Sequence, residues 1–230
     1  MTTSGPVKSF LKSRFPRAAS VYLDTRQALT RRSLVTVFSE IYHTNAWKDS
    51  ESVSGRGSTL ARTTVITSQS PVLLHELNAR SLLDAACGDF NWLRYAELGS
   101  VKYTGVDVVP DLIARNRQLY ETAQRTFAVH DITKDRLPDA DAILCRDCLI
   151  HLSFKSINAV ISNFKQTNAT HLLCTTHTSV TKNTDCPDGS WRNVNLLLPP
   201  FNFPHPVKLV VEDEELGKCL GVWRLADLQD

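Results

Sequence analysis

Two side chains that can move a proton, a carboxylate and an imidazole, lie four residues apart at Asp147 and His151. A helix that begins here would place both of them on one face. Such a pair supplies a general base, His151, and a carboxylate, Asp147, that orients it, which is the arrangement needed to deprotonate a hydroxyl. His177, at the end of the next apolar run, is a third catalytic candidate. The alternative is that His151 only packs or caps a helix.

The same cluster could hold a divalent cation such as Mg²⁺, with His177 or Asp131 nearby. Hard cations prefer several oxygen ligands, and the sequence guarantees only the carboxylate of Asp147. A divalent metal therefore stays an open alternative, and no residue is assigned as a metal ligand.

Cysteine spacing argues against zinc. Cys145 and Cys148 form a C-x-x-C pair, but a structural zinc site needs a second pair at matching spacing, and the chain has none. Several of the six cysteines lie in apolar runs, where a free thiol behaves as a small buried hydrophobe. We expect six reduced thiols and a cytoplasmic protein.

Further carboxylates follow three short apolar runs, at Asp84, Asp107 and Asp131. The first lies in a turn of small residues, Asp84 to Gly88, which lets a bulky ligand approach the backbone. A dinucleotide site would need G-x-G-x-x-G to seat a pyrophosphate. With Asp84 and Asp89, this turn repels a pyrophosphate and suits a ligand that carries a sulfonium and an ammonium. The charge pattern therefore favours S-adenosylmethionine (SAM) over NAD.

The elements that must position these residues follow from an alternation of apolar and helical segments. The predicted strands cover residues 81–86, 101–108, 126–131, 141–147 and 171–177, followed by 207–213 and 219–225. The predicted helices between the earlier strands include residues 111–124 and 153–166, and another helix begins near Asn91. This order predicts an α/β fold, a doubly wound, mostly parallel seven-stranded sheet with an antiparallel C-terminal hairpin. Ligands bind at the carboxyl ends of strands in such sheets.

Helices are also predicted before the sheet, over residues 18–46 and 60–78, with a polar loop at 50–59 between them. Residues 1–34 hold seven Lys or Arg and one acid, which favours a solvated basic helix. We divide the chain into residues 1–60, N-terminal helices and a loop that covers the cofactor, and residues 61–230, the SAM-binding domain; together they are expected to form one structural unit.

The turn sequence Asp84-Ala85-Ala86-Cys87-Gly88 resembles motif I of the Rossmann-like (class I) SAM-dependent methyltransferases, with alanine in the first glycine position. The resemblance implies roles for several strand-end residues. It implies that Asp107 accepts hydrogen bonds from the ribose hydroxyls, with Val108 against the adenine, and that Asp131 and Ile132 contact the adenine amino group and ring. The cofactor-binding residues at these three strand ends are Asp84, Ala86, Gly88, Asp107, Val108, Asp131 and Ile132.

The segment 41–58 resembles one that precedes the core of bacterial enzymes of glycan and polysaccharide methylation, including methylmannose polysaccharide assembly. The resemblance implies that Tyr42 and Trp47 cover the cofactor, and that Arg56, Gly57 and Ser58 wrap its carboxylate end. Arg146 is a further predicted cofactor contact. The alternative is an ordinary flexible loop between two helices.

These observations predict a SAM-dependent O-methyltransferase that acts on a hydroxyl of a sugar or polysaccharide precursor. A net charge of +2 gives no support to a nucleic-acid binder, and Pro199-Pro200-Phe201 lacks the preceding Asp or Asn of adenine-N6 DNA methyltransferases. No apolar run is long enough for a transmembrane segment. The alternatives are another acceptor, such as a small natural product or a protein side chain, and a catalytically silent SAM-binding subunit. A homodimer is compatible with the sequence.

Overall fold

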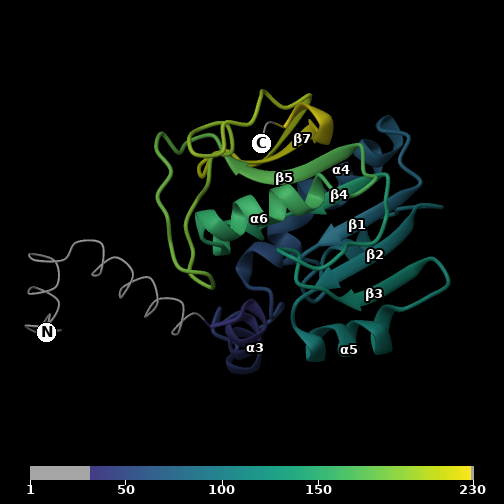
Figure 1. The fold of residues 1–230 in the computed structure, drawn as a ribbon. Helices are drawn as coiled ribbons and strands as arrows, with labels where there is room; N and C mark the ends of the chain where they lie inside the picture. The colour runs from purple at the N-terminus through teal and green to yellow at the C-terminus, as the bar shows by residue number, and fades with distance from the viewer. Residues whose placement is uncertain (1–31, 229–230) are drawn as a thin grey trace, which may run out of the picture. The chain divides into compact units, whose positions relative to one another are not determined.

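Seven strands form one sheet in the order β3-β2-β1-β4-β5-β7-β6 in the computed structural model, which describes residues 32–228 (Figure 1). The strands are β1 Ser81–Ala85, β2 Lys102–Asp107, β3 Arg125–Val129, β4 Ala142–Cys145, β5 His171–His177, β6 Lys208–Asp213 and β7 Lys218–Arg224. Strands β1 to β5 pair in parallel, whereas β7 is antiparallel to both β5 and β6. The predicted fold, including its C-terminal hairpin, is confirmed.

Side chains of the central strands alternate between two hydrophobic cores, one on each face of the sheet. Leu83 and Ala85 of β1 belong to the core that contains α6 (Phe154–Phe164), whereas Leu82 packs in the core with α4 (Leu60–Glu76). Figure 1 shows α6 in front of the sheet and α4 behind it. Because successive side chains of a strand point to opposite faces, burial of both faces requires the nearly continuous apolar runs seen in the sequence.

The helices match the predictions except between β1 and β2. Helix α5 (Pro110–Tyr120) and helix α6 lie where the sequence placed them. The helix expected near Asn91 is wrong, because the connection contains only the short 3₁₀ turn Leu93–Tyr95. Gly88 and Phe90 have φ of 55° and 56°, in the left-handed region, which prevents a regular right-handed helix from starting here.

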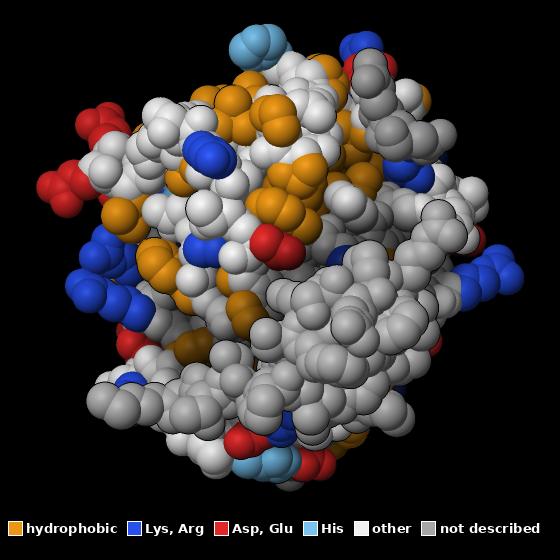
Figure 2. Space-filling view, turned by 60° about the vertical axis from the view of Figure 1, so that its left-hand side comes forward, with side chains coloured by type: hydrophobic (Ala, Val, Ile, Leu, Met, Phe, Trp, Pro, Cys, Tyr) orange, Lys and Arg blue, Asp and Glu red, His pale blue; other side chains and the backbone are white. Residues whose placement is uncertain are grey.

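Before the sheet, helix α3 (Leu34–Thr44) belongs to the same compact unit as the strands, which begins at Leu34. The earlier part of the predicted helix 18–46, and nearly all of the basic segment 1–34, lie outside the described residues. Over 32–228, none of the helices has the length and apolar character needed to cross a bilayer. Figure 2 shows one face of the molecule, where hydrophobic side chains gather in the upper part and charges of both signs surround them.

Candidate active site

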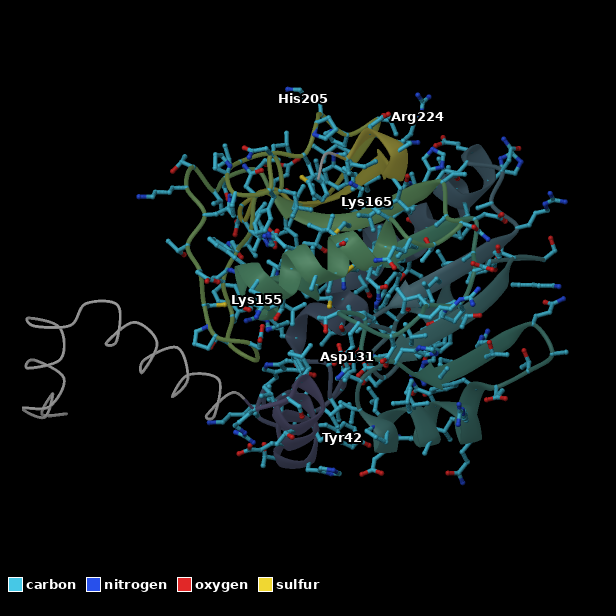
Figure 3. All side chains as sticks on the ribbon, viewed as in Figure 1. Tyr42, Asp131, Lys155, Lys165, His205 and Arg224 are labelled. Atoms are coloured by element: carbon cyan, nitrogen blue, oxygen red, sulfur yellow. The ribbon has the colours of Figure 1, made fainter. Side chains whose placement is uncertain are left out.

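A cavity of about 120 Å³, which we call the cofactor cavity, lies at the carboxyl ends of β1, β2 and β4 and beneath α3. Most of the residues predicted to bind a cofactor line it, and so do two of the catalytic candidates. These residues are Tyr42, Trp47, Ser58, Asp84, Ala86, Gly88, Asp107, Val108, Asp131, Ile132, Arg146, Asp147 and His151. Figure 3 labels two of them, Tyr42 on α3 and Asp131 beyond β3, on the same side of the molecule.

Two carboxylates of this cavity are buried with few compensating partners. Asp84 is 5% exposed and accepts a hydrogen bond from the Tyr103 hydroxyl at 2.8 Å. Burial raises the pKa of Asp84 to about 7. Asp107 accepts backbone N–H bonds from Gly88 at 3.2 Å and Val109 at 3.1 Å, yet burial raises its pKa to about 6. A cationic or hydrogen-bond-donating ligand would stabilise the charged form of both groups.

Asp131 differs from these two, because its carboxylate already has local partners. It accepts hydrogen bonds from the Thr133 hydroxyl at 2.6 Å and the Thr133 backbone N–H at 3.1 Å, and Lys134 lies 3.1 Å away. Burial raises the pKa of Asp131, but these partners outweigh it and hold the pKa below its ordinary value. A hydrogen bond from the adenine amino group to Asp131, which the resemblance implies, would thus compete with the hydrogen bonds that Thr133 already donates.

The loop that precedes α4 is fastened to the turn after β1 by Asp89. The carboxylate of Asp89 accepts hydrogen bonds from the Ser52 hydroxyl, the Val53 backbone N–H and the Ser54 hydroxyl, at 2.9 to 3.1 Å. A Cβ atom at Gly88 would collide with Ser54 Oγ, so glycine is required for this close approach. Asp89 was assigned from sequence only as a charge in the turn; the structure shows that it positions the covering loop.

His151 is held in a defined tautomer. Its Nδ1 lies 2.9 Å from the carbonyl oxygen of Ser190, which can only accept, so Nδ1 carries the hydrogen and Nε2 is left with a lone pair. Its ring packs on Trp47 with a centroid separation of 4.8 Å. Burial lowers the pKa of His151, which favours the neutral form. The predicted orienting role of Asp147 is corrected, because the Ser190 carbonyl occupies that position on the ring.

The physical reason for this correction is the local backbone. Residues Leu149–His151 form a 3₁₀ turn, and the α-helix begins only at Phe154, so the four-residue spacing does not put Asp147 and His151 on one helical face. The Ser190 carbonyl reaches His151 because Arg192 fastens its loop, donating to the carbonyl oxygens of Leu149 and Leu152.

Asp147 belongs instead to a buried cluster of four charges. Its carboxylate pairs with Lys218 and lies 3.3 Å from Arg146, and Arg146 donates two hydrogen bonds to Glu212 at 2.6 and 2.9 Å. Burial raises the pKa of Asp147, but the two cations outweigh burial and lower the pKa to about 2. The guanidinium of Arg146 also lies over the ring of Trp92. Arg146 thus borders the cofactor cavity as part of an ion-pair network.

A second cavity of about 490 Å³, which we call the acceptor cavity, lies beyond Trp47 and His151. These two residues line both cavities, and so do Ser54 and Asp147. Arg56, Gly57 and His177, three of the predicted site residues, line only this one. Gly57 packs so closely on Asp147 that a Cβ atom would lie 2.8 Å from the carboxylate.

Four residues of the acceptor cavity were not assigned individually from the sequence, although two of them lie in the segment 191–204, whose aromatic and amide side chains are typical of carbohydrate sites. They are Trp191, Asn193, Glu212 and Lys218. The signal that could have found two of them is a charge in an apolar strand, since Glu212 ends the run VKLVVE and Lys218 opens KCLGVW.

A metal site has no support in the donor set. In the part of the chain that the structure describes, no group of three His, Cys, Asp or Glu side chains is arranged to hold a metal ion. The Asp147 carboxylate pairs with cations, and all six cysteines are free thiols. The open alternative of Mg²⁺ at Asp147, His151 and His177 is therefore not carried further.

Comparison with known proteins identifies the class. Residues 82–169, from β1 to the residues before β5, match the family model of a methyltransferase domain. A comparison with curated proteins gives no match.

Solved structures of similar fold are also methyltransferases. Human N-acetylserotonin methyltransferase in complex with SAM has a TM-score of 0.58 at 14% identity, covering 97% of this chain and 72% of that one. The 1,6-didemethyltoxoflavin-N1-methyltransferase of Burkholderia thailandensis, with bound S-adenosylhomocysteine (SAH), has a TM-score of 0.56 at 17% identity, covering 86% and 88%. The methyltransferase domain of a bacterial Hen1 (CtHen1-CN) has a TM-score of 0.52 at 16% identity, covering 72% and 100%.

The fold and the match over residues 82–169 both support a methyltransferase of the SAM-dependent, Rossmann-like class. The predicted enzyme class and its cofactor, SAM, are confirmed at this level. At identities of 14 to 17%, these likenesses carry the fold and leave the acceptor undetermined.

Proposed function

We propose that this chain transfers the methyl group of SAM to a hydroxyl group, with His151 as the general base. The observation that carries the proposal is the position of His151, which lines both cavities and whose Nε2 is free to accept a proton. An alcohol needs such a base because its own pKa is far above neutral.

The residues of the cofactor cavity fit SAM. When bound, SAM supplies an activated methyl group on a sulfonium. Asp107 offers two carboxylate oxygens to a vicinal diol, and Val108 and Ile132 supply apolar surface for a flat base. Asp84, buried and short of partners, gains a counter-charge from a cationic ligand. Tyr42 and Ser58 complete the wall on the side of the covering segment.

His151 activates the acceptor by taking the proton of its hydroxyl group at Nε2. With Nδ1–H fixed on the Ser190 carbonyl, Nε2 accepts the hydroxyl proton, and the Ser190 carbonyl then stabilises the imidazolium. Trp47 packs against the ring and keeps it from turning away. His177, 3% exposed at the end of β5, lines only the acceptor cavity and is assigned to the acceptor rather than to the proton.

The acceptor that the second cavity fits best is a sugar or a polysaccharide precursor. Two indole rings, Trp47 and Trp191, border a wall of polar side chains, which suits a ring with both apolar C–H and polar O–H surface. Arg56 and Gly57 belong to this cavity, so we assign them to the acceptor. Six free thiols fit a reducing compartment such as the cytoplasm.

The test is a screen of acceptors with SAM labelled on its methyl group, read by mass spectrometry of the product. We expect label on the oxygen of a sugar or a sugar-containing precursor, and we expect His151→Ala to slow its incorporation by about 10²–10⁴. Label on nitrogen of a small natural product or a protein side chain would replace this proposal with the alternative acceptor. SAM binding with no transfer to any class would favour a silent subunit.

A further inference from the structure

Three residues that line the acceptor cavity each carry a buried polar atom that has no hydrogen-bond partner within residues 32–228. They are Glu212 Oε1, His177 Nδ1 and Asn193 Oδ1. The Glu212 side chain is 2% exposed and His177 is 3% exposed, so bulk water does not serve them. An unmade hydrogen bond on a buried group costs about 1–3 kcal/mol, and three of them in residues that line one cavity favour a wall that contacts a ligand.

The chemistry of these atoms defines what the ligand must offer. A carboxylate oxygen and an amide oxygen only accept hydrogen bonds, and a neutral imidazole nitrogen accepts or donates according to its tautomer. The ligand must therefore bring several donors close together, either as O–H groups or as N–H groups.

Charge separates these two possibilities. Glu212 and Asp147 are already neutralised by Arg146 and Lys218, so the buried cluster holds two anions and two cations. Nearer the surface, Arg62 pairs with Asp213.

Arg56 tips this balance, because its guanidinium has no ion pair within the described part of the chain. The lining residues alone carry three cations and three anions, and Arg146, which pairs with Asp147 and Glu212 from behind the wall, adds one positive charge. This excess disfavours a protonated amine. A neutral hydroxyl donor meets no such penalty.

We propose that Glu212, His177 and Asn193 select a neutral, polyhydroxylated acceptor and reject the matching amine. The inference rests on the proposed function, because it takes this cavity as the place where the acceptor lies. The three residues come from different segments: Glu212 from β6, His177 from the end of β5, and Asn193 from the loop between these strands. In this role they are specificity-determining residues, distinct from the base His151.

The experiment measures binding directly, by saturation-transfer NMR on protein saturated with SAH. The probes are methyl α-D-glucopyranoside and methyl α-D-mannopyranoside, each compared with its 2-amino-2-deoxy counterpart at pH 7. We expect at least one neutral glycoside to bind at least tenfold more tightly than its amine counterpart. Asn193→Ala and His177→Gln should each weaken that binding at least fivefold, and Asn158→Ala, an exposed amide on α6, should not change it.

Three results would overturn the inference: neither neutral glycoside binds, the amine binds as tightly, or binding is unchanged in both cavity variants. Glu212→Gln tests the same wall, but it breaks a buried ion pair, so the other two variants keep the test valid if it fails to fold. SAH affinity is measured in the same samples by calorimetry. A protein that does not bind SAH contradicts the proposed function, whereas SAH binding without selection of glycosides contradicts only this inference.

Discussion

The cofactor cavity and the acceptor cavity share four residues, Trp47, Ser54, Asp147 and His151, but they are assembled in different ways. The cofactor cavity takes its carboxylates from the ends of neighbouring parallel strands, so each lies at a position that the strand pattern fixes. The acceptor cavity combines the loop before α4, the end of β5, a distant loop and the β6–β7 hairpin. The positions of the cofactor-cavity carboxylates follow from local sequence patterns, whereas the acceptor cavity forms only when segments far apart in the sequence come together.

The largest expected effect tests the residue where the two cavities meet. His151→Ala should lower kcat by about 10²–10⁴, because the acceptor hydroxyl loses its base, while SAH affinity stays nearly unchanged. The measurement is steady-state turnover, alongside a thermal midpoint and SAH calorimetry on the same preparation. His205→Ala, an exposed histidine labelled in Figure 3, is the matched control. Near-normal turnover in a folded His151→Ala variant would end the general-base assignment.

The second prediction separates Asp147 from His151. Asp147→Asn should lower the free energy of unfolding by about 3 kcal/mol, since Lys218 and Arg146 lose a buried partner. Turnover per folded molecule should fall much less than in His151→Ala. Urea unfolding measures the loss, and the double variant Asp147→Asn, Lys218→Met should recover part of it. A single variant as stable as the parent would show that the cluster is not stabilised by Asp147.

The sequence predicts more of the cofactor cavity than of the acceptor cavity, because the first is built from local patterns and the second from distant segments. Asp84 could be placed because a buried strand followed by a small-residue turn is a local pattern, and Asp107 could be placed because it ends another short apolar run. The partner of His151 could not, because Ser190 is 39 residues away and reaches it through a loop without regular structure. The expected helix at Asn91 failed because the sequence did not reveal the left-handed backbone at Phe90.

The third prediction concerns a residue that both sequence and structure place in the cofactor cavity. Asp107→Ala should weaken SAH binding by roughly 1–3 kcal/mol, about 5- to 150-fold, because the ribose hydroxyls lose a charged acceptor. Calorimetry with SAH measures this loss. Asp139→Ala, an exposed carboxylate in the loop before β4, should have no effect. Unchanged affinity in a folded Asp107→Ala variant would refute the ribose assignment. Asp107 would then have only a structural role, as the acceptor of the Gly88 N–H hydrogen bond.

The last prediction is a pH dependence of ligand affinity and of stability, whose sign differs between Asp84 and His151. Without ligand, burial raises the pKa of Asp84 to about 7 and of Asp107 to about 6. SAM favours their charged forms, so its affinity should fall as pH drops below 7, by up to about tenfold per pH unit for each proton taken up.

The stability of the unliganded protein should also depend on the pKa of Asp84. A raised folded-state pKa stabilises the protein fully below the unfolded value of 3.8, and this contribution is lost as pH rises through about 7. Asp84→Asn should therefore be more stable than the unliganded parent by several kcal/mol at pH 8, on the order of 4 kcal/mol for a full shift from 3.8 to about 7, and by about a third of that amount at pH 5, while binding SAM more weakly. The contribution of His151 to stability has the opposite pH dependence. Burial lowers the pKa of His151, so the protein loses stability as pH falls below 6.5, where the unfolded chain takes up a proton that the folded protein does not. Thermal midpoints of the parent, Asp84→Asn and His151→Ala at pH 5, 6.5 and 8 resolve the two trends. A parallel shift of Asp84→Asn and parent across this range would show that Asp84 is not the group that titrates.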